Sequence, residues 1–129
     1  MEMHRIRLRH PWEKQIQGAS AASSVAVPEP ASEPNDSASQ AAPATYCRSF
    51  HRPTGLERTS TVMLRISNWQ GQLESLQLNE QTLPCPQGPP LEIDITAWLA
   101  SRNQLLIYLV PQTDEPVRLS GEVELAIMP

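Results

Sequence analysis

The feature that most constrains the fold of this chain is the alternation of apolar and polar residues in its second half. Within residues 60–68, Val62, Leu64 and Ile66 occupy every second position. This period of two puts the three side chains on one face of an extended strand, whereas a helix requires a spacing near 3.6 residues. The same alternation recurs in residues 73–79, 91–95 and 117–128. Each segment is therefore predicted to be a β-strand with one buried face.

The residues around these segments favour turns and one helical turn. Residues 84–90 (PCPQGPP) cannot continue a helix or a central strand, because proline lacks the backbone donor. Asp94 or Thr96 is predicted to cap a single helical turn over residues 97–101. Residues 104–110 (QLLIYLV) are apolar on both faces, which predicts a central strand covered on two sides. The whole pattern predicts an all-β fold, an antiparallel β-sandwich of about six or seven strands.

Composition divides the chain into three parts. Residues 1–17 are predicted to supply the first strand of the sandwich, with Ile6 and Leu8 on one face. Residues 18–45 contain 9 Ala, 6 Ser and 4 Pro and lack aromatic residues, Leu and Ile. They are predicted to form a disordered insertion, because they bury too little apolar surface to offset the loss of chain entropy. Residues 46–129 are predicted to form the remainder of the sandwich.

The charge pattern argues against nucleic acid as a partner. The net charge is −4, and the arginines are scattered apart from Arg5, Arg7 and Arg9. A protein that binds phosphate backbones normally clusters its basic residues on one surface. The three arginines alternate along the first strand and are interpreted as a solvated strand face, with a phosphate or acidic-glycan patch as the alternative.

Neither an export signal nor a membrane segment is visible, so a cytoplasmic location is expected. The first residues are charged and lack the apolar core of a secretory signal. No stretch approaches the roughly 18 apolar residues of a membrane-spanning helix. In a reducing cytoplasm, Cys47 and Cys85 are expected to be free thiols.

Four short motifs follow one another between residues 62 and 109. They are residues 62–66 (VMLRI), 76–79 (LQLN), 93–96 (IDIT) with Leu99, and 102–105 (RNQL). Their order resembles the galactose-binding-like jelly roll that forms the sugar-binding domain of glycoside hydrolase family 2 enzymes, and residues 5–12 and 48–50 resemble its opening strands. The resemblance implies a jelly-roll β-sandwich in which Asn103 tolerates an unusual backbone angle before the next strand.

One position departs from the pattern of that family. Glu80 follows Asn79 where the family has glycine, so the tight Asn-Gly hairpin is expected to be replaced by a longer or different turn. In the hydrolases of this family the catalytic acid and nucleophile lie on a separate barrel domain, which this chain is too short to contain. The resemblance therefore implies a non-catalytic domain.

The titratable residues form no catalytic or metal-binding pattern, and no cofactor is predicted. The three histidines lack the spacing of metal ligands. Glu92 and Asp94 are two residues apart on one strand, as are Glu122 and Glu124 on another. Such pairs are typical of a solvated strand face rather than of the opposed carboxyl groups of a glycosidase. The chain is therefore predicted not to be an enzyme.

Aromatic residues are scarce, and one of them lies in a predicted loop among amides. Sugar-binding sites usually combine an exposed aromatic ring with polar groups that fix the ligand. Asn68, Trp69 and Gln70 meet this condition in loop 68–71 and are the candidate ligand-binding residues. The alternative, which we favour, is that Trp69 folds over an edge of the sandwich. Trp98 is predicted to plug one end of the core.

Several functions remain open from the sequence. The first is a non-catalytic binding or interaction module of unknown ligand, acting alone or with a partner chain. The second is a carbohydrate-binding module that uses loop 68–71. An accessory subunit of a glycoside hydrolase and an enzyme with an unexpected metal or cofactor are less favoured. The expected partner is accordingly a carbohydrate or another protein chain.

Overall fold

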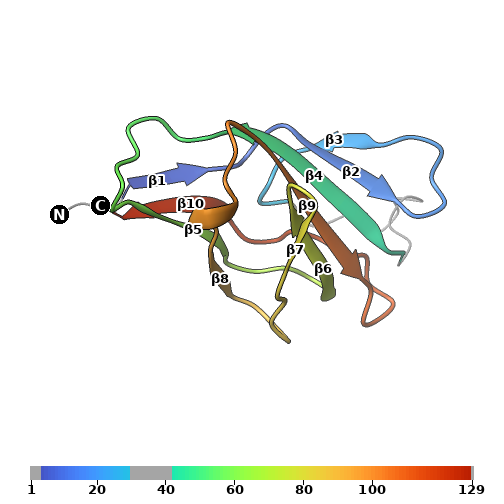
Figure 1. Ribbon diagram of the computed structural model, residues 1–129. Helices are drawn as coiled ribbons and strands as arrows, with labels where there is room; N and C mark the ends of the chain where they lie inside the picture. Colours follow the sequence, from blue (N-terminus) through green and yellow to red (C-terminus); the bar gives the residue numbers. More distant parts are fainter. Residues whose placement is uncertain (1–3, 30–41, 129) are drawn as a thin grey trace.

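Two antiparallel sheets face each other in the computed structural model, which describes residues 4–29 and 42–128 (Figure 1). The four-stranded sheet has the strand order β1-β10-β5-β8, and the six-stranded sheet has the order β3-β2-β4-β9-β6-β7. One short 3₁₀ turn, η1 (Thr96–Trp98), precedes β9. The predicted all-β antiparallel sandwich with a helical turn is confirmed.

The strand bounds differ in places from those expected. The four-stranded sheet consists of β1 (His4–Arg7), β10 (Val123–Met128), β5 (Thr61–Ile66) and β8 (Leu91–Asp94). The six-stranded sheet consists of β3 (Ser23–Val25), β2 (Trp12–Ile16), β4 (Ala44–His51), β9 (Arg102–Val110), β6 (Gln72–Leu78) and β7 (Gln81–Leu83).

Side chains from both sheets fill one core between them. Val62, Leu64 and Ile66 of β5 are 0% exposed, which confirms the alternation predicted for this strand. From the opposite sheet, Leu105 and Ile107 of β9 are equally buried. Because successive strand side chains point to opposite faces, this burial fixes the register of each strand.

β9 is a central strand, as predicted, but only one of its faces is covered. It lies between β4 and β6. Leu106, Tyr108 and Val110 remain partly exposed on the outer face of the six-stranded sheet. The prediction of burial on two sides is wrong, because the four-stranded sheet packs only against the opposite face of β9.

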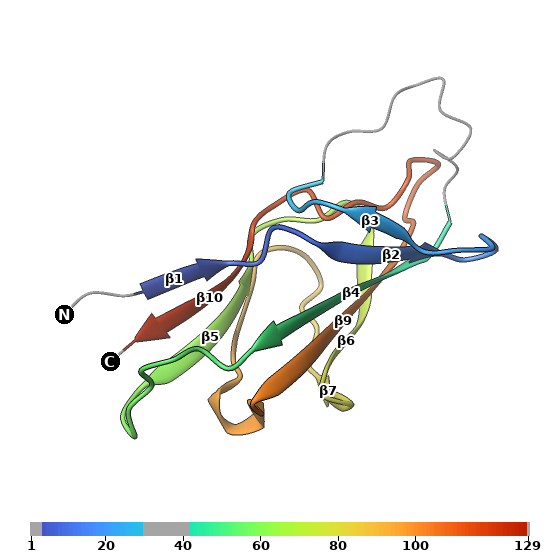
Figure 2. The ribbon, with the colours of Figure 1, turned by 90° about the horizontal axis from the view of Figure 1, so that it is seen from above.

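The N-terminal segment contributes to both sheets, so the prediction of a single first strand needs correction. β1 pairs with β10 in the four-stranded sheet, whereas β2 pairs with β3 and β4 in the other (Figure 2). Pro11, which has no amide hydrogen, stands where the chain changes sheet. Here Trp12 Nε1 donates to the Leu8 carbonyl at 2.6 Å, and both side chains are buried. Ile6 is 38% exposed and does not share a buried face with Leu8.

The insertion predicted to be disordered, residues 18–45, is ordered at both of its ends. Ser23–Val25 form β3, and Val27 and Ala44 are each 1% exposed in the core. Composition misjudged these residues because strands that lie elsewhere in the sequence supply the apolar surface against which they pack. Residues 30–41 lie outside the described residues.

A partly buried ion pair anchors the first of these ordered ends. The Lys14 ammonium lies 2.7 Å from the Glu29 carboxylate, and both side chains are 12% exposed. The Tyr46 hydroxyl donates to the same carboxylate at 2.5 Å, and the Leu119 amide donates to it at 3.2 Å. Burial, reinforced by the negative charge of Glu29, raises the pKa of the Tyr46 hydroxyl, which therefore stays protonated as the donor.

β10 begins at Val123, later than the strand predicted over residues 117–128. Gly121 lies just before β10 and packs against the loop that follows β5. A Cβ at this position would overlap Ser67 Oγ and the Asn68 amide nitrogen. The glycine therefore permits two backbone segments to approach closely at the point where the chain enters the sheet.

Replacing Glu29 by alanine is expected to lower the free energy of unfolding by about 3 kcal/mol. The change leaves the Lys14 ammonium and the Tyr46 hydroxyl largely buried without their acceptor. Urea denaturation followed by circular dichroism measures the effect. Glu13→Ala removes an exposed carboxylate from β2 and is the control, with an expected change within about 0.5 kcal/mol. Equal effects of the two substitutions would contradict the anchoring role of Glu29.

Candidate functional site

The predicted ligand-binding residues Asn68, Trp69 and Gln70 lie between β5 and β6 but do not form an exposed platform. Trp69 is 5% exposed and belongs to the core. Gln70 Nε2 donates to the Pro116 carbonyl at 2.5 Å, and the backbone of Gln70 pairs with that of Arg118. Asn68 is exposed. This placement agrees with the interpretation of Trp69 as a core residue, since stacking on a sugar requires a free ring face.

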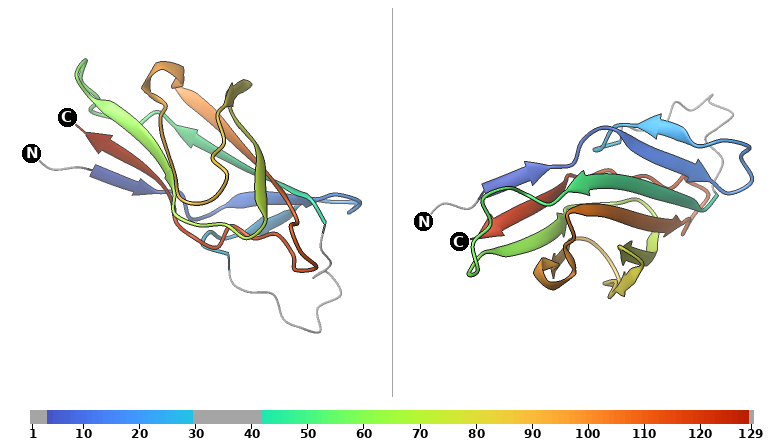
Figure 3. Two further views of the ribbon diagram at one scale, coloured as in Figure 1. Left: turned by 90° about the horizontal axis from the view of Figure 1, so that it is seen from below. Right: turned by 45° about the horizontal axis from the view of Figure 1, so that its top comes forward.

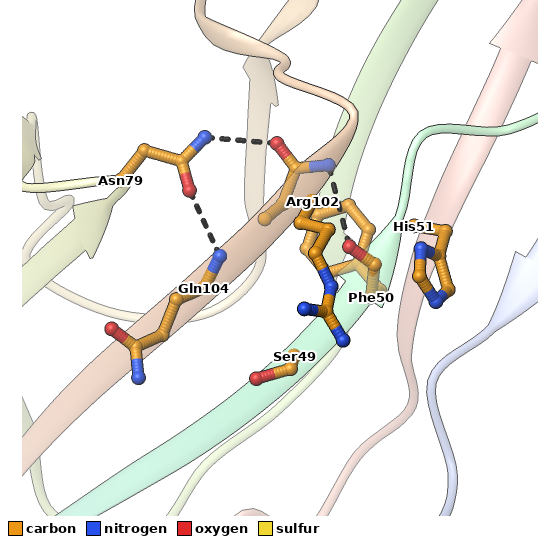
Figure 4. A pocket seen from close by; sticks show the side chains of 7 residues that line it. Ser49, Phe50, His51, Asn79, Arg102 and Gln104 are labelled. Carbon is orange, nitrogen blue, oxygen red and sulfur yellow. Dashed lines mark hydrogen bonds between the residues drawn. The ribbon is translucent and has the colours of Figure 1, made fainter.

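A polar pocket of about 410 Å³ opens at the opposite end of β6 (Figure 4). At this end of the sandwich the end of β4, the turn η1, the start of β9 and the β6–β7 turn come together (Figure 3). The pocket is lined by Ser49, Phe50, His51, Asn79, Arg102, Asn103 and Gln104. It therefore collects residues from two strands and the β6–β7 turn, which are far apart in the sequence.

Asn103 is a buried polar residue, 3% exposed, that holds the floor of this pocket. Its side-chain oxygen accepts from Asn79 Nδ2 and from the Ala100 amide, both at 2.8 Å. Its Nδ2 donates to the Ala100 carbonyl at 2.9 Å and to the Phe50 carbonyl at 3.4 Å. All four hydrogen-bonding positions of the amide are thus used. The role implied by the resemblance, tolerance of an unusual backbone angle, is not what Asn103 does, since its φ is not positive.

Asn79 and Glu80 form the tight turn between β6 and β7. Both have positive φ angles, 52° and 70°, and Leu78 pairs directly with Gln81 across the turn. This is the conformation that the family's Asn-Gly sequence favours. The expectation of a longer or different turn is wrong. Glu80 adopts the positive φ angle of the tight turn, although residues other than glycine and asparagine rarely take this conformation. The tight turn lets Asn79 reach across, so that its Oδ1 accepts from the Gln104 amide at 2.9 Å.

Four exposed side chains lie at the mouth of the pocket, and one of them, Gln104, also donates from Nε2 to Cys47 Sγ at 3.4 Å. His51 pairs with Arg102, and Ser49 pairs with Gln104, on adjacent strands β4 and β9. All four residues are exposed, and Figure 4 shows the Arg102 guanidinium close to Ser49 and His51. Among residues 4–29 and 42–128, no acidic side chain lines this pocket. Hydroxyl, amide and guanidinium groups at such spacing can donate to and accept from the hydroxyl groups of a polar ligand.

Trp98 lies at the same end of the sandwich and is 40% exposed, whereas the other two tryptophans, Trp12 and Trp69, are 0% and 5% exposed. The prediction that Trp98 plugs the core is wrong, because Leu99 packs against the core in its place. Asn79 Nδ2 donates to the Trp98 carbonyl at 3.1 Å, which ties η1 to the pocket.

The helical turn η1 spans Thr96–Trp98 rather than the predicted residues 97–101, and its N-cap position is Ile95, without a side-chain cap hydrogen bond. Asp94, one of the two predicted caps, instead binds Thr96 at the start of the turn. Its carboxylate accepts from the Thr96 amide at 2.9 Å and from the Thr96 hydroxyl at 2.6 Å. These hydrogen bonds lower the pKa of the Asp94 carboxyl. The Thr96 hydroxyl in turn accepts from the Val62 amide of β5 at 2.8 Å, so the turn that carries Trp98 is fixed to the four-stranded sheet.

Sequence reasoning missed this site although most of its motifs were visible. Asn79 and Asn103 stood out only as structural positions, and Trp98 was assigned to the core. The available signal was the tryptophan two residues after Thr96, beside a sharp turn. Periodicity could not reveal it, because a single helical turn is too short to define a buried face.

The paired carboxylates lie on the outer face of the four-stranded sheet. Arg65 lies 2.8 Å from Glu92 and 4.0 Å from Glu124, and Arg9 lies 3.7 Å from Glu122. These carboxylates border a second pocket of about 320 Å³, which also includes Arg5 and Arg7. The arrangement is a ladder of ion pairs on an open face.

Neither a metal centre nor a membrane span emerges from the described ranges. Residues 4–29 and 42–128 contain no group of three His, Cys, Asp or Glu side chains that could hold a metal ion. No helix among these residues is long and apolar enough to cross a membrane. Cys47 and Cys85 are free thiols.

No protein-family model and no curated protein matches the chain, but its fold occurs in solved structures of glycosidases. The β-glucuronidase of Faecalibacterium prausnitzii superposes with a TM-score of 0.79 at 15% identity, over 98% of this chain and 32% of that one. The chain shares its fold with part of a glycosidase.

Two other glycosidases contain a part with the same fold. The β-glucuronidase of Bifidobacterium dentium, solved with coumarin-3-O-glucuronide, gives a TM-score of 0.75 at 17% identity, over 98% of this chain and 30% of that one. The β-D-mannosidase of Dictyoglomus thermophilum gives 0.73 at 11% identity, over 97% and 22%. The chain therefore spans less than a third of these enzymes, and the likeness to a glycosidase β-sandwich expected from the motifs is confirmed at the level of the fold.

Glu80→Gly is expected to raise the free energy of unfolding by about 1 kcal/mol, because glycine adopts the positive φ without strain. Glu80→Ala, which keeps a Cβ, is expected to give no gain. Chemical denaturation of the two variants measures the difference. Equal stabilities of the glycine and alanine variants would show that the turn carries no backbone strain.

Asp94→Asn is expected to reduce stability at pH 7 by about 0.5 kcal/mol, a small effect because the carboxylate is exposed. The pKa of Asp94 is lower in the folded chain than in the unfolded one, so its contribution exists above the ordinary value of 3.8 and disappears as the pH falls through the folded pKa. Unfolding measured between pH 7 and pH 2.5 should show the two proteins converge at the acid end. A constant difference would contradict the assignment.

Proposed function

We propose that this chain is a non-catalytic carbohydrate-binding module whose ligand lies in the pocket between β4, β9 and the β6–β7 turn, beside Trp98. The observation that carries the proposal is the combination of an exposed tryptophan with a polar pocket at one end of a rigid sandwich. Sugars bind where an aromatic ring covers the apolar face of the ring and nearby polar groups reach its hydroxyls. In this proposal Trp98 replaces Trp69 as the aromatic component.

The side chains of the pocket have complementary roles. Ser49 and Gln104 can both donate and accept, which suits sugar hydroxyls, and Arg102 donates only. Asn79 and Asn103 satisfy each other and the surrounding backbone, so they position the site rather than contact the ligand. A site built on strand ends and a fixed turn needs little reorganisation on binding.

The surroundings of the carboxylates support the absence of catalysis. Glu92, Glu122 and Glu124 are engaged by arginines on an open sheet face, and Asp94 is occupied by Thr96. A glycosidase needs two carboxyl groups on opposite sides of one bound sugar. The similar structures are glycosidases, and this chain spans only a fraction of each. This similarity supports carbohydrate, rather than another class of ligand, as the proposed ligand.

A glycan array probed with the purified chain tests this proposal, followed by calorimetry with each glycan that binds. Trp98→Ala is expected to weaken binding about fivefold to tenfold, because stacking on an aromatic ring contributes about 1–1.4 kcal/mol. Arg102→Ala is expected to weaken it through the loss of hydrogen bonds. Circular dichroism and thermal unfolding confirm that each variant is folded.

Ile6→Ala is the matched control, since Ile6 is the other large exposed apolar side chain among the described residues. It lies on β1 and should leave binding unchanged. The proposal is wrong if the wild-type chain binds no glycan, or if Ile6→Ala weakens binding as much as Trp98→Ala does.

A further inference from the structure

The pocket between β4, β9 and the β6–β7 turn has basic side chains at its mouth, although the chain as a whole is acidic. Arg102 and His51 are paired residues on β9 and β4, and both are exposed (Figure 4). Arg52 follows His51, and its Nη1 donates to the Leu99 carbonyl at 3.5 Å. Among residues 4–29 and 42–128, no aspartate or glutamate lines the pocket. This end of the sandwich therefore presents guanidinium groups to a pocket without an acidic wall.

The guanidinium of Arg102 has no carboxylate partner within the described ranges. The salt bridges there are made by other basic residues, which lie elsewhere in the sandwich: Arg9, Lys14 and Arg65. Glu57 and Glu80 lie close along the chain to residues of the pocket, but neither belongs to its lining. An arginine without an acidic partner keeps its donors for an anionic group of a ligand.

The arginines before β2 are in a different electrostatic setting. Arg7 pairs with Glu124 across β1 and β10, and Arg9 lies 3.7 Å from Glu122. The pocket on this sheet is lined by Glu92 as well as by Glu122 and Glu124. An anion that approached these arginines would also meet three carboxylates, whose repulsion opposes the attraction. The pocket beside Arg102 is therefore the more suitable place for an acidic ligand than the basic run that stands out in the sequence.

The backbone that carries Arg102 is fixed on both sides. Asn103, the next residue, is buried and uses all of its hydrogen-bonding positions. On the other side, the Arg52 amide donates to the Ser101 carbonyl at 3.0 Å, which continues the pairing of β4 with β9. A guanidinium on a fixed backbone can hold a carboxylate or a sulfate through parallel N–H donors, and only the side chain has to be ordered on binding.

We infer that the ligand of this pocket is an acidic saccharide, one that carries a carboxylate or a sulfate group. The inference rests on the proposed function and specifies the class of its ligand. The anionic group is bound by Arg102 and His51, and the sugar ring extends toward Trp98. Ser49 and Gln104 serve the remaining hydroxyl groups. Because the net charge of −4 repels an anion at long range, a preference for an acidic ligand has to arise from the pocket itself.

A glycan array with neutral, uronic-acid and sulfated oligosaccharides tests the inference, followed by calorimetry on matched pairs. One pair is an oligogalacturonide and its carboxyl-reduced form, and the other is a sulfated galactan oligosaccharide and its desulfated form. The charged member of at least one pair is expected to bind at least about tenfold more tightly than the uncharged member, and that pair identifies the anionic group. Raising NaCl from about 20 to about 500 mM is expected to weaken the charged member at least about fivefold and the uncharged member less than about twofold.

Substitutions separate the role of the charge from that of the aromatic ring. Arg102→Gln is expected to abolish the preference, so that the two members of a pair bind within about twofold of each other. Arg5→Gln is the matched control, because it removes the same charge from an exposed residue of β1 and should leave the preference unchanged. Trp98→Ala is expected to weaken both members by a similar factor, since stacking does not depend on the charge of the ligand. Circular dichroism verifies that each variant is folded.

The outcomes distinguish this inference from the proposed function. Binding confined to uncharged saccharides, or equal affinity within both pairs, overturns the inference and leaves carbohydrate binding standing. If no saccharide on the array binds, both are overturned. The inference also fails if Arg5→Gln reduces the preference as much as Arg102→Gln does, because the preference would then reflect the overall charge of the chain. A preference that disappears with Arg102→Gln and persists with Arg5→Gln supports it.

Discussion

The buried amide of Asn103 makes the hydrogen bonds on which the pocket end of this molecule depends. An amide removed from water must make all of its hydrogen bonds, because each unsatisfied group would cost about 1–3 kcal/mol. Its four partners belong to β4, to the β6–β7 turn and to the segment between η1 and β9. All four hydrogen bonds of Asn103 form at once in this arrangement of the three segments. That arrangement forms the pocket and sets η1, with its exposed tryptophan, beside it.

The two sheets differ in the residues that cover their outer faces. Both use period-two burial to build one core, and that constraint says nothing about their outer faces. The four-stranded sheet covers its outer face with ion pairs, which keep it in water. The six-stranded sheet leaves an apolar stripe around Tyr108 between hydroxyl and amide groups. The two sheets of one sandwich therefore present outer faces of different chemistry.

The N-terminal segment shows how distant contacts override composition. Residues 18–29 carry little apolar surface of their own, but the Glu29 carboxylate binds Lys14 and Tyr46 and accepts from the Leu119 amide. These partners lie on β2, on β4 and just before β10, so the order of the segment depends on contacts with both the sheets and the chain before β10. Composition reports what a segment can bury by itself, and it misses order that other segments supply.

The sequence by itself determined the all-β class, the alternating core positions and the turn that Asp94 holds. Each of these is a local property, set by the spacing of neighbouring residues or by one side chain bonding to a nearby amide. Only the tertiary structure decided which tryptophan is exposed, how the first segment divides between the sheets, and that Asn79 and Asn103 share a hydrogen bond. These features depend on contacts between residues far apart in the chain, and periodicity carries no information about such pairs.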